Sequence, residues 1–148
     1  MAIASCLVDT NILLRLARRS DPQHCLIYAA VSKLASEGTG LYYTHQNIAE
    51  LWNVMTRPVT RNGFGLTTAD VEREVRVIES GMSLLPDSEG VYREWRKVVV
   101  QFAVSRVQVH DARLVVVMLV HGVGHMLTLN VADFSRYEGI KVLQPASI

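Results

Sequence analysis

The sequence lacks an apolar stretch long enough to cross a membrane as a helix, which needs about 20 consecutive apolar residues. Its longest apolar run, residues 114–120, is much shorter and ends at His121 and Gly122. Linker-like segments rich in Pro, Gly or Ser are also missing. With 49% hydrophobic and 20% charged residues, the chain is expected to form one globular domain over residues 1–148, with no membrane contact.

The chain also has few cysteines and a net charge close to zero. Cys6 and Cys25 have neither metal-ligand spacing nor a redox motif, so we expect two reduced thiols in a cytoplasmic protein. The net charge of +1 gives no overall attraction for polyanions, so contact with nucleic acid must come from local patches. His121 and His125 have the i, i+4 spacing of a zinc-binding helix, but glycines lie between them and no glutamate accompanies them. These features give no support for a disulfide scaffold or a zinc site.

Short apolar runs alternate along the chain with segments of helical periodicity. Strands are expected at residues 5–8, 41–44, 82–85, 126–129 and 140–143. Helices are expected at residues 12–16, from 21 to about 37, at 46–56, from 68 onward, from about 89 to 102, and at 112–120. Such alternation predicts βαβ crossovers and the α/β class, with a central, mostly parallel sheet flanked by helices on both faces.

Two of these helices carry more detailed predictions. Asp21 precedes a proline and is expected to cap the second helix, with Leu26, Ala30 and Leu34 on its buried face. Residues 112–120 are apolar nearly all round, which predicts a buried helix preceded by a short non-helical connector.

Four acidic residues stand where an α/β sheet gathers its functional groups. Asp9 and Asp133 follow expected strands, Asp111 opens the most apolar helix, and Glu50 lies on the polar face of its helix. Each has an ordinary alternative explanation, because the aspartates could cap helices and the glutamate could simply face solvent. Ligands of such folds bind beyond the carboxyl ends of the strands, near the point where strand order reverses. We therefore expect Asp9, Glu50 and Asp111 to converge there.

Clustered carboxylates repel each other and raise one another's pKa unless a hard cation neutralises them. The set contains only oxygen ligands, which favours Mg²⁺ or Mn²⁺. Such a cation can activate water and stabilise the transition state of phosphodiester cleavage. A metal-dependent phosphoryl-transfer site is therefore predicted.

Four segments carry a family resemblance. They are Leu7-Val-Asp9-Thr-Asn11-Ile-Leu-Leu-Arg15, Gln46-Asn-Ile-Ala-Glu50-Leu-Trp-Asn-Val, Val109-His-Asp111-Ala-Arg-Leu-Val and Thr128-Leu-Asn130-Val-Ala-Asp133-Phe134. In this order and spacing they resemble the acidic motifs of PIN-domain ribonucleases of the VapC type, the toxins of type II toxin–antitoxin pairs. The resemblance runs from Leu7 to about Pro145.

The resemblance implies a PIN fold, a homodimer, an RNA substrate and a small antitoxin that covers the acidic cleft. It implies Mg²⁺-dependent endoribonuclease activity. The acids that it assigns to metal binding and catalysis are Asp9, Glu50, Asp111 and Asp133. The polar residues that it assigns to their support are Asn11 and Asn130.

Two alternatives remain open at this point. A haloacid-dehalogenase-like phosphatase would use Asp9 as a covalent nucleophile, although Asn11 replaces the second aspartate of that family's motif and no Gly-Asp pair precedes Asp133. A non-catalytic PIN-like binding module would be expected to have lost some of the acidic positions. Because all of them are present, the sequence favours the enzyme.

Overall fold

Five parallel strands form the centre of the protein in a computed structural model that describes residues 2–148. The strands are β1 (Ser5–Val8), β2 (Gly40–Thr44), β3 (Ser83–Leu85), β4 (His125–Leu127) and β5 (Lys141–Leu143). Their order across the sheet is β3-β2-β1-β4-β5, and every neighbouring pair is parallel. The expected parallel sheet is therefore confirmed.

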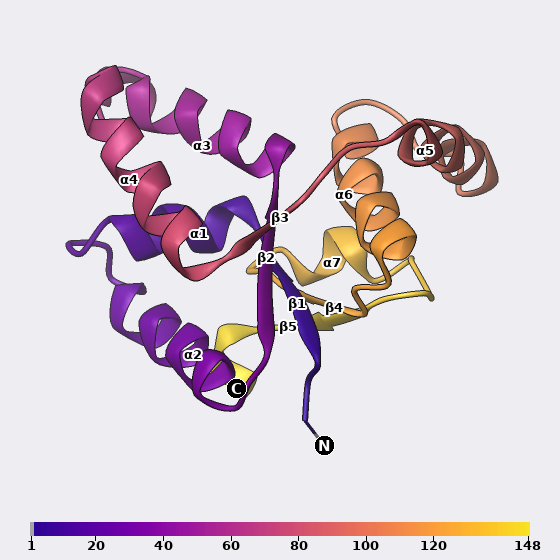
Figure 1. Ribbon diagram of the computed structural model, residues 1–148. Coiled ribbons are helices and arrows are strands. Elements are labelled where there is room, and N and C mark those ends of the chain that lie inside the picture. The colour runs from indigo at the N-terminus through magenta and orange to yellow at the C-terminus, as the bar shows by residue number, and fades with distance from the viewer. Residues whose placement is uncertain (1) are drawn as a thin grey trace.

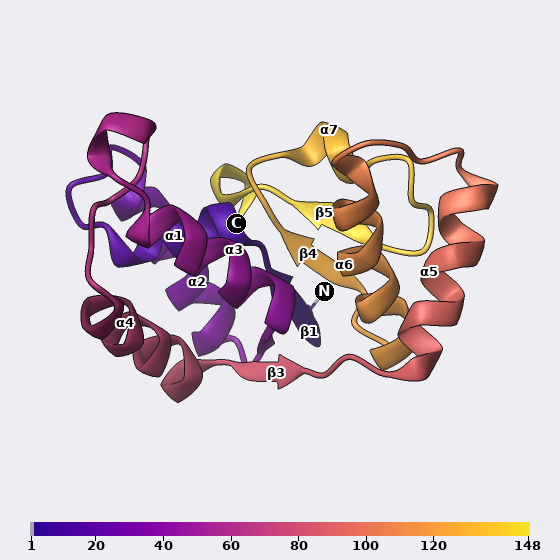
Figure 2. The same ribbon diagram turned by 90° about the horizontal axis from the view of Figure 1, so that it is seen from above.

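Helices cover both faces of this sheet (Figure 1). They are α1 (Thr10–Ala17), α2 (His24–Ser36), α3 (His45–Thr56), α4 (Thr68–Gly81), α5 (Glu89–Gln101), α6 (Gln108–His121) and α7 (Val131–Phe134), with 3₁₀ turns η1 (Val59–Arg61) and η2 (Pro145–Ser147). The first four helices lie on one face and the last three on the other, as both views show (Figures 1 and 2). Within residues 2–148, no helix is both long and apolar enough to span a membrane.

Alternation along the strands divides the core between these two helical layers. In β1, Cys6 and Val8 pack with α1 to α4, whereas Leu7 packs with α5 to α7. In β4, Leu127 belongs to the first cluster and Met126 to the second. All five side chains are fully buried, as expected for a parallel sheet covered on both faces.

Two details of the helices differ from the sequence-based prediction. Helix α2 begins at His24 rather than Asp21, whose carboxylate accepts a hydrogen bond from the Gln23 backbone N–H in the preceding turn. The buried face of α2 consequently includes Ile27, while Leu26 is exposed. Helix α6 begins at Gln108, so the expected connector forms its first turn.

Strand order reverses between β1, the central strand, and its neighbour β4. The chain moves outward to β2 and β3 on one side of β1 and later builds β4 and β5 on the other. A crevice opens beyond the strand ends at such a reversal, because the connections leave in opposite directions. Asp9 immediately follows β1 and Thr128 immediately follows β4, so both residues lie at this point of the sheet.

Candidate active site

Asp9 is a buried carboxylate at the end of β1, with only 6% of its surface exposed. It is also the N-cap of α1, since its side chain accepts the Thr10 backbone N–H at 2.8 Å. Its other oxygen accepts hydrogen bonds from the Thr128 hydroxyl at 2.8 Å and the Asn11 amide at 3.3 Å. The capping explanation for Asp9 is therefore correct, and it coexists with a place in the acidic cluster.

Burial is the main reason why the pKa of Asp9 is raised above its ordinary value. The hydrogen bonds from Thr128 and Thr10 act in the opposite direction, because they stabilise the charged form. The negative charges of Glu50 and Asp133 raise the pKa further. Asp9 is therefore a carboxylate whose charge is poorly compensated by the protein alone.

Glu50 is held on α3 by two hydrogen bonds to its carboxylate. The Thr10 hydroxyl donates to one oxygen at 2.8 Å, and the Gln46 side-chain amide donates to the other at 2.8 Å. Thr10 in turn accepts a hydrogen bond at 3.0 Å from the side chain of Asn47, which is fully buried. The polar face of α3 is thus directed at the β1 loop rather than left in solvent.

Asp111 lies in the first turn of α6, which has no side-chain cap. Its pKa is raised to about 6, first by burial and then by the negative charges of Asp133, Asp9 and Glu50, while His110 partly offsets them. Simple capping therefore does not explain Asp111. Four acids from different elements share one electrostatic environment, as their order in the sequence predicts.

One cleft of about 340 Å³ brings three of these acids together. Asp9, Glu50 and Asp111 all line it, with Asn11 and Asn130 beside them. Asp133, in the first turn of α7, does not line this cleft, but its charge acts on Asp9 and Asp111.

The side chains of this cleft are not arranged as a complete metal cage. Across residues 2–148, no three acidic, histidine or cysteine side chains are grouped closely enough to hold an ion. Thr10, Gln46, Thr128 and Asn11 instead hold the oxygens of Asp9 and Glu50.

Asn11 joins the end of β1 to the end of β4, and Asn130 supports the β4 end locally. The Asn11 amide donates to the Thr128 hydroxyl at 3.2 Å, and its oxygen accepts the Leu129 backbone N–H at 3.2 Å. The Asn130 backbone N–H donates to the same Thr128 hydroxyl at 3.0 Å. This network fixes the β1 and β4 loops relative to each other.

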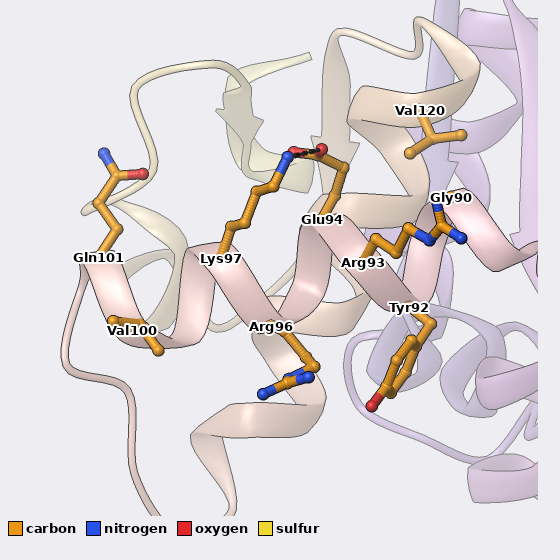
Figure 3. A pocket seen from close by; sticks show the side chains of 9 residues that line it. All are labelled: Gly90, Tyr92, Arg93, Glu94, Arg96, Lys97, Val100, Gln101 and Val120. Carbon is orange, nitrogen blue, oxygen red and sulfur yellow. Dashed lines mark hydrogen bonds and ion pairs between the residues drawn. The ribbon is translucent and has the colours of Figure 1, made fainter.

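A larger hollow lies outside this site, along the exposed side of α5 (Figure 3). Arg93, Arg96 and Lys97 line it, together with Glu94, which pairs with Lys97 at 3.0 Å. None of the four clustered acids reaches it. The clustered acids therefore identify the smaller cleft as the candidate active site.

Three residues that hold the acids in place were not assigned this role from the sequence. They are Thr10, Asn47 and Thr128. Their partners are 37 to 119 positions away in the chain, so periodicity does not reveal these contacts. The one available signal was polarity at positions next to Asp9 and directly after β4.

The family model of the PIN domain matches residues 6–140. The chain therefore belongs to the PIN domain family, in agreement with the sheet order and the acidic cleft. No curated protein sequence is significantly similar to it.

Solved structures with the same fold include chains of toxin–antitoxin complexes. The chain is similar to VapBC2 from Rickettsia felis, bound to a DNA fragment from its promoter, with a TM-score of 0.71, 14% identity and coverage of 95% of this chain and 98% of that one. VapC20 from Mycobacterium tuberculosis, a toxin that cleaves the sarcin-ricin loop, gives a TM-score of 0.68 at 14% identity, covering 93% and 98%. FitAcB from Neisseria gonorrhoeae gives a TM-score of 0.66 at 18% identity, and the match covers 97% of this chain and 99% of that one. At these identities the likeness concerns the fold.

Proposed function

We propose that this chain is a divalent-cation-dependent endoribonuclease and the toxin component of a VapBC-type toxin–antitoxin pair. The observation that carries the proposal is the convergence of Asp9, Glu50 and Asp111 in one cleft at the reversal of strand order. The raised pKa values of Asp9 and Asp111 support it, because perturbed carboxylates in a cleft are typical of catalytic sites.

The residues of the cleft fit Mg²⁺ or Mn²⁺. The side chains available are carboxylates and amides, and oxygen is the ligand that these cations prefer. Mg²⁺ usually keeps several waters and needs only one or two carboxylates, so a preformed cage of three acids is not required. Asp9, Glu50 and Asp111 line the cleft and would hold the cation directly or through water, with Asp133 as a fourth acid nearby. When bound, the cation supplies charge neutralisation and polarises water and the scissile phosphate.

The chain's own residues orient this chemistry. Thr128 and the Thr10 backbone fix Asp9, while the Thr10 hydroxyl and Gln46 fix Glu50. A carboxylate has about four acceptor sites, and Asp9 and Glu50 use three and two of them for hydrogen bonds, so both keep acceptor capacity for a ligand. Fixed carboxylates reduce the reorganisation needed when an anionic phosphodiester enters the cleft, and such preorganisation is a major source of catalytic rate.

The partner of the toxin is proposed from the structural neighbours. The proteins that share the fold include VapBC and FitAB complexes, some of them bound to DNA. We propose a small cognate antitoxin that covers the acidic cleft, and a homodimer as the functional form. The phosphatase alternative gains no support, because Asn11 donates its amide to Asp9 where that chemistry requires a second carboxylate.

Cleavage of a mixed RNA by antitoxin-free protein tests the proposal. After exhaustive EDTA treatment we expect no cleavage, and restoring Mg²⁺ or Mn²⁺ should recover it. Asp111→Asn and Glu50→Gln should lose most of this activity, while Glu37→Gln, at an exposed acid on the C-cap of α2, should keep it. Undiminished cleavage in EDTA, abolished only by modifying histidines, would point instead to a metal-free acid–base ribonuclease.

A further inference from the structure

An aromatic pocket of about 370 Å³ lies between α5 and the start of α6. Tyr92 and Trp95 form part of its wall, with ring centroids 6.5 Å apart and planes inclined by 36°. The Trp95 indole N–H donates to the Val109 carbonyl at 2.8 Å. This hydrogen bond fixes the larger ring against the same helix that carries Asp111.

The aromatic pocket is connected to the acidic cleft through shared walls. Glu50 and Asn53 line both the acidic cleft and an adjoining hollow between α3 and α6. His110 and Arg113 line both that hollow and the aromatic pocket. The acidic cleft, this hollow and the aromatic pocket are therefore neighbours along one side of the protein, with His110 and Arg113 between the acids and the two aromatic rings.

The charges differ between the acidic cleft and the aromatic pocket. Carboxylates line the acidic cleft, whereas Arg113 and its partner Asp87 both line the aromatic pocket. Arg113 is partly exposed and pairs with Asp87 at 2.6 Å. A guanidinium in this position can exchange a carboxylate for a phosphate, the other planar bidentate partner that arginine prefers.

We propose that the aromatic pocket is a nucleotide subsite of the RNA substrate. It takes the unpaired base of a nucleotide next to the scissile phosphate, which stacks on Trp95 or Tyr92 while Arg113 binds the intervening backbone phosphate. The inference rests on the proposed ribonuclease function and adds to it a binding position for one base beside the cleavage site. A base buried in a duplex stack cannot enter a pocket, whereas an unstacked base can.

The size and lining of the pocket favour this ligand. Its volume lies within the range of about 300–1,000 Å³ that is usual for small-molecule sites. Aromatic stacking accepts any base, and it is worth about 5- to 100-fold in affinity per base. Tyr92 is also 56% exposed, so a ligand can reach it without movement of the backbone.

Abasic substitution in a short single-stranded RNA tests the subsite. The wild type is first used to locate a cleaved bond, and the base on each side of that bond is then removed in turn. One of the two abasic substrates should show a kcat/KM about 5- to 100-fold lower. Tyr92→Ala or Trp95→Ala should lower kcat/KM on the intact RNA by a similar factor and abolish the sensitivity to that missing base.

Matched variants separate the subsite from folding effects. Tyr92→Ala removes an exposed ring and Trp95→Phe keeps the stacking surface, so both test the pocket if Trp95→Ala fails to fold. Arg113→Gln should raise KM and reduce its salt dependence. Arg76→Gln, which breaks an ion pair with Glu72 on α4, should change neither KM nor the salt dependence of KM.

Trp95 fluorescence gives a readout that does not depend on cleavage. The chain has two tryptophans, so Trp52→Phe leaves Trp95 as the only tryptophan, and Asp111→Asn is used to prevent turnover. Titration with the same RNA should quench this fluorescence, and the abasic RNA should quench it less. The subsite would be refuted if folded Tyr92 and Trp95 variants kept the wild-type kcat/KM and the same sensitivity to the missing base. It would also be refuted if these variants lost only antitoxin binding. Failure of the wild type to cut any RNA would instead refute the proposed function.

Discussion

Replacement of Asp111 by asparagine should stabilise the metal-free protein at neutral pH. The pKa of Asp111 rises from an ordinary value of 3.8 to about 6 in the folded chain. A shift of this size corresponds to at most about 3 kcal/mol, and screening at a half-exposed carboxylate reduces it to roughly half. Loss of the favourable interaction between the carboxylate and the α6 dipole reduces the stabilisation by about 0.5 kcal/mol. The net gain is therefore about 1 kcal/mol, or about 2–4 °C in Tm for a chain of this size.

The stabilisation by Asp111→Asn should depend on pH. An acid with a raised pKa in the folded state destabilises that state only when it is ionised. The penalty is absent below about pH 4, grows between pH 4 and pH 6, and is complete above pH 6. The Tm advantage of Asp111→Asn should follow the same course and disappear in acid.

Thermal unfolding in EDTA between pH 4 and pH 8 measures this effect. Glu37→Gln is the matched control, since it removes an exposed acid outside the cleft and should leave Tm nearly unchanged throughout. A lower Tm for Asp111→Asn at pH 8 would show that the helix interaction outweighs the repulsion, and the electrostatic reasoning would then be wrong. Added Mg²⁺ should raise the Tm of the wild type more than that of the variant.

The remaining predictions concern the network behind the acids and the choice of cation. Thr10→Val should lower kcat more than it raises KM, because Glu50 loses one of its two hydrogen-bond donors, and Thr10→Ser should restore most of the activity. Asn47→Ala should cost about 1–3 kcal/mol in urea unfolding, since the buried Thr44 backbone N–H loses its acceptor; a loss below about 0.5 kcal/mol would contradict this. Ca²⁺ should support slower RNA cleavage than Mg²⁺, because its looser geometry positions water and phosphate less precisely. Equal rates with the two ions would argue against a geometric role for the cation.

The meeting of the acids in one cleft was predictable because two of them, Asp9 and Asp111, break a local pattern. Asp9 ends an apolar strand and Asp111 opens an apolar helix, so their positions after or before core elements are visible in the sequence. Parallel topology then brings such positions to one edge of the sheet. Glu50 needed the family resemblance as well, because a glutamate on a polar helix face is ordinarily solvated.

Contacts between distant segments could not be predicted in the same way. The Thr10–Glu50 and Asn47–Thr10 hydrogen bonds depend on how α3 docks against α1. The aromatic pocket depends on how α5 packs against α6. In the sequence alone, Trp95 has the pattern of an ordinary core residue on an amphipathic helix. The boundary error in α2 has a local cause: the Asp21 carboxylate stabilises a turn before the helix instead of its first turn.

The central claim is that the cleft of Asp9, Glu50 and Asp111 holds a divalent cation. Crystals grown with Mn²⁺ test it directly, because the anomalous signal locates the ion without assuming its ligands. We expect a peak within coordination distance of Asp9 and Asp111, absent from Asp111→Asn crystals grown in the same way. Mn²⁺ bound only at histidines or on the protein surface, with this cleft empty in an active preparation, would contradict a cation site at these acids.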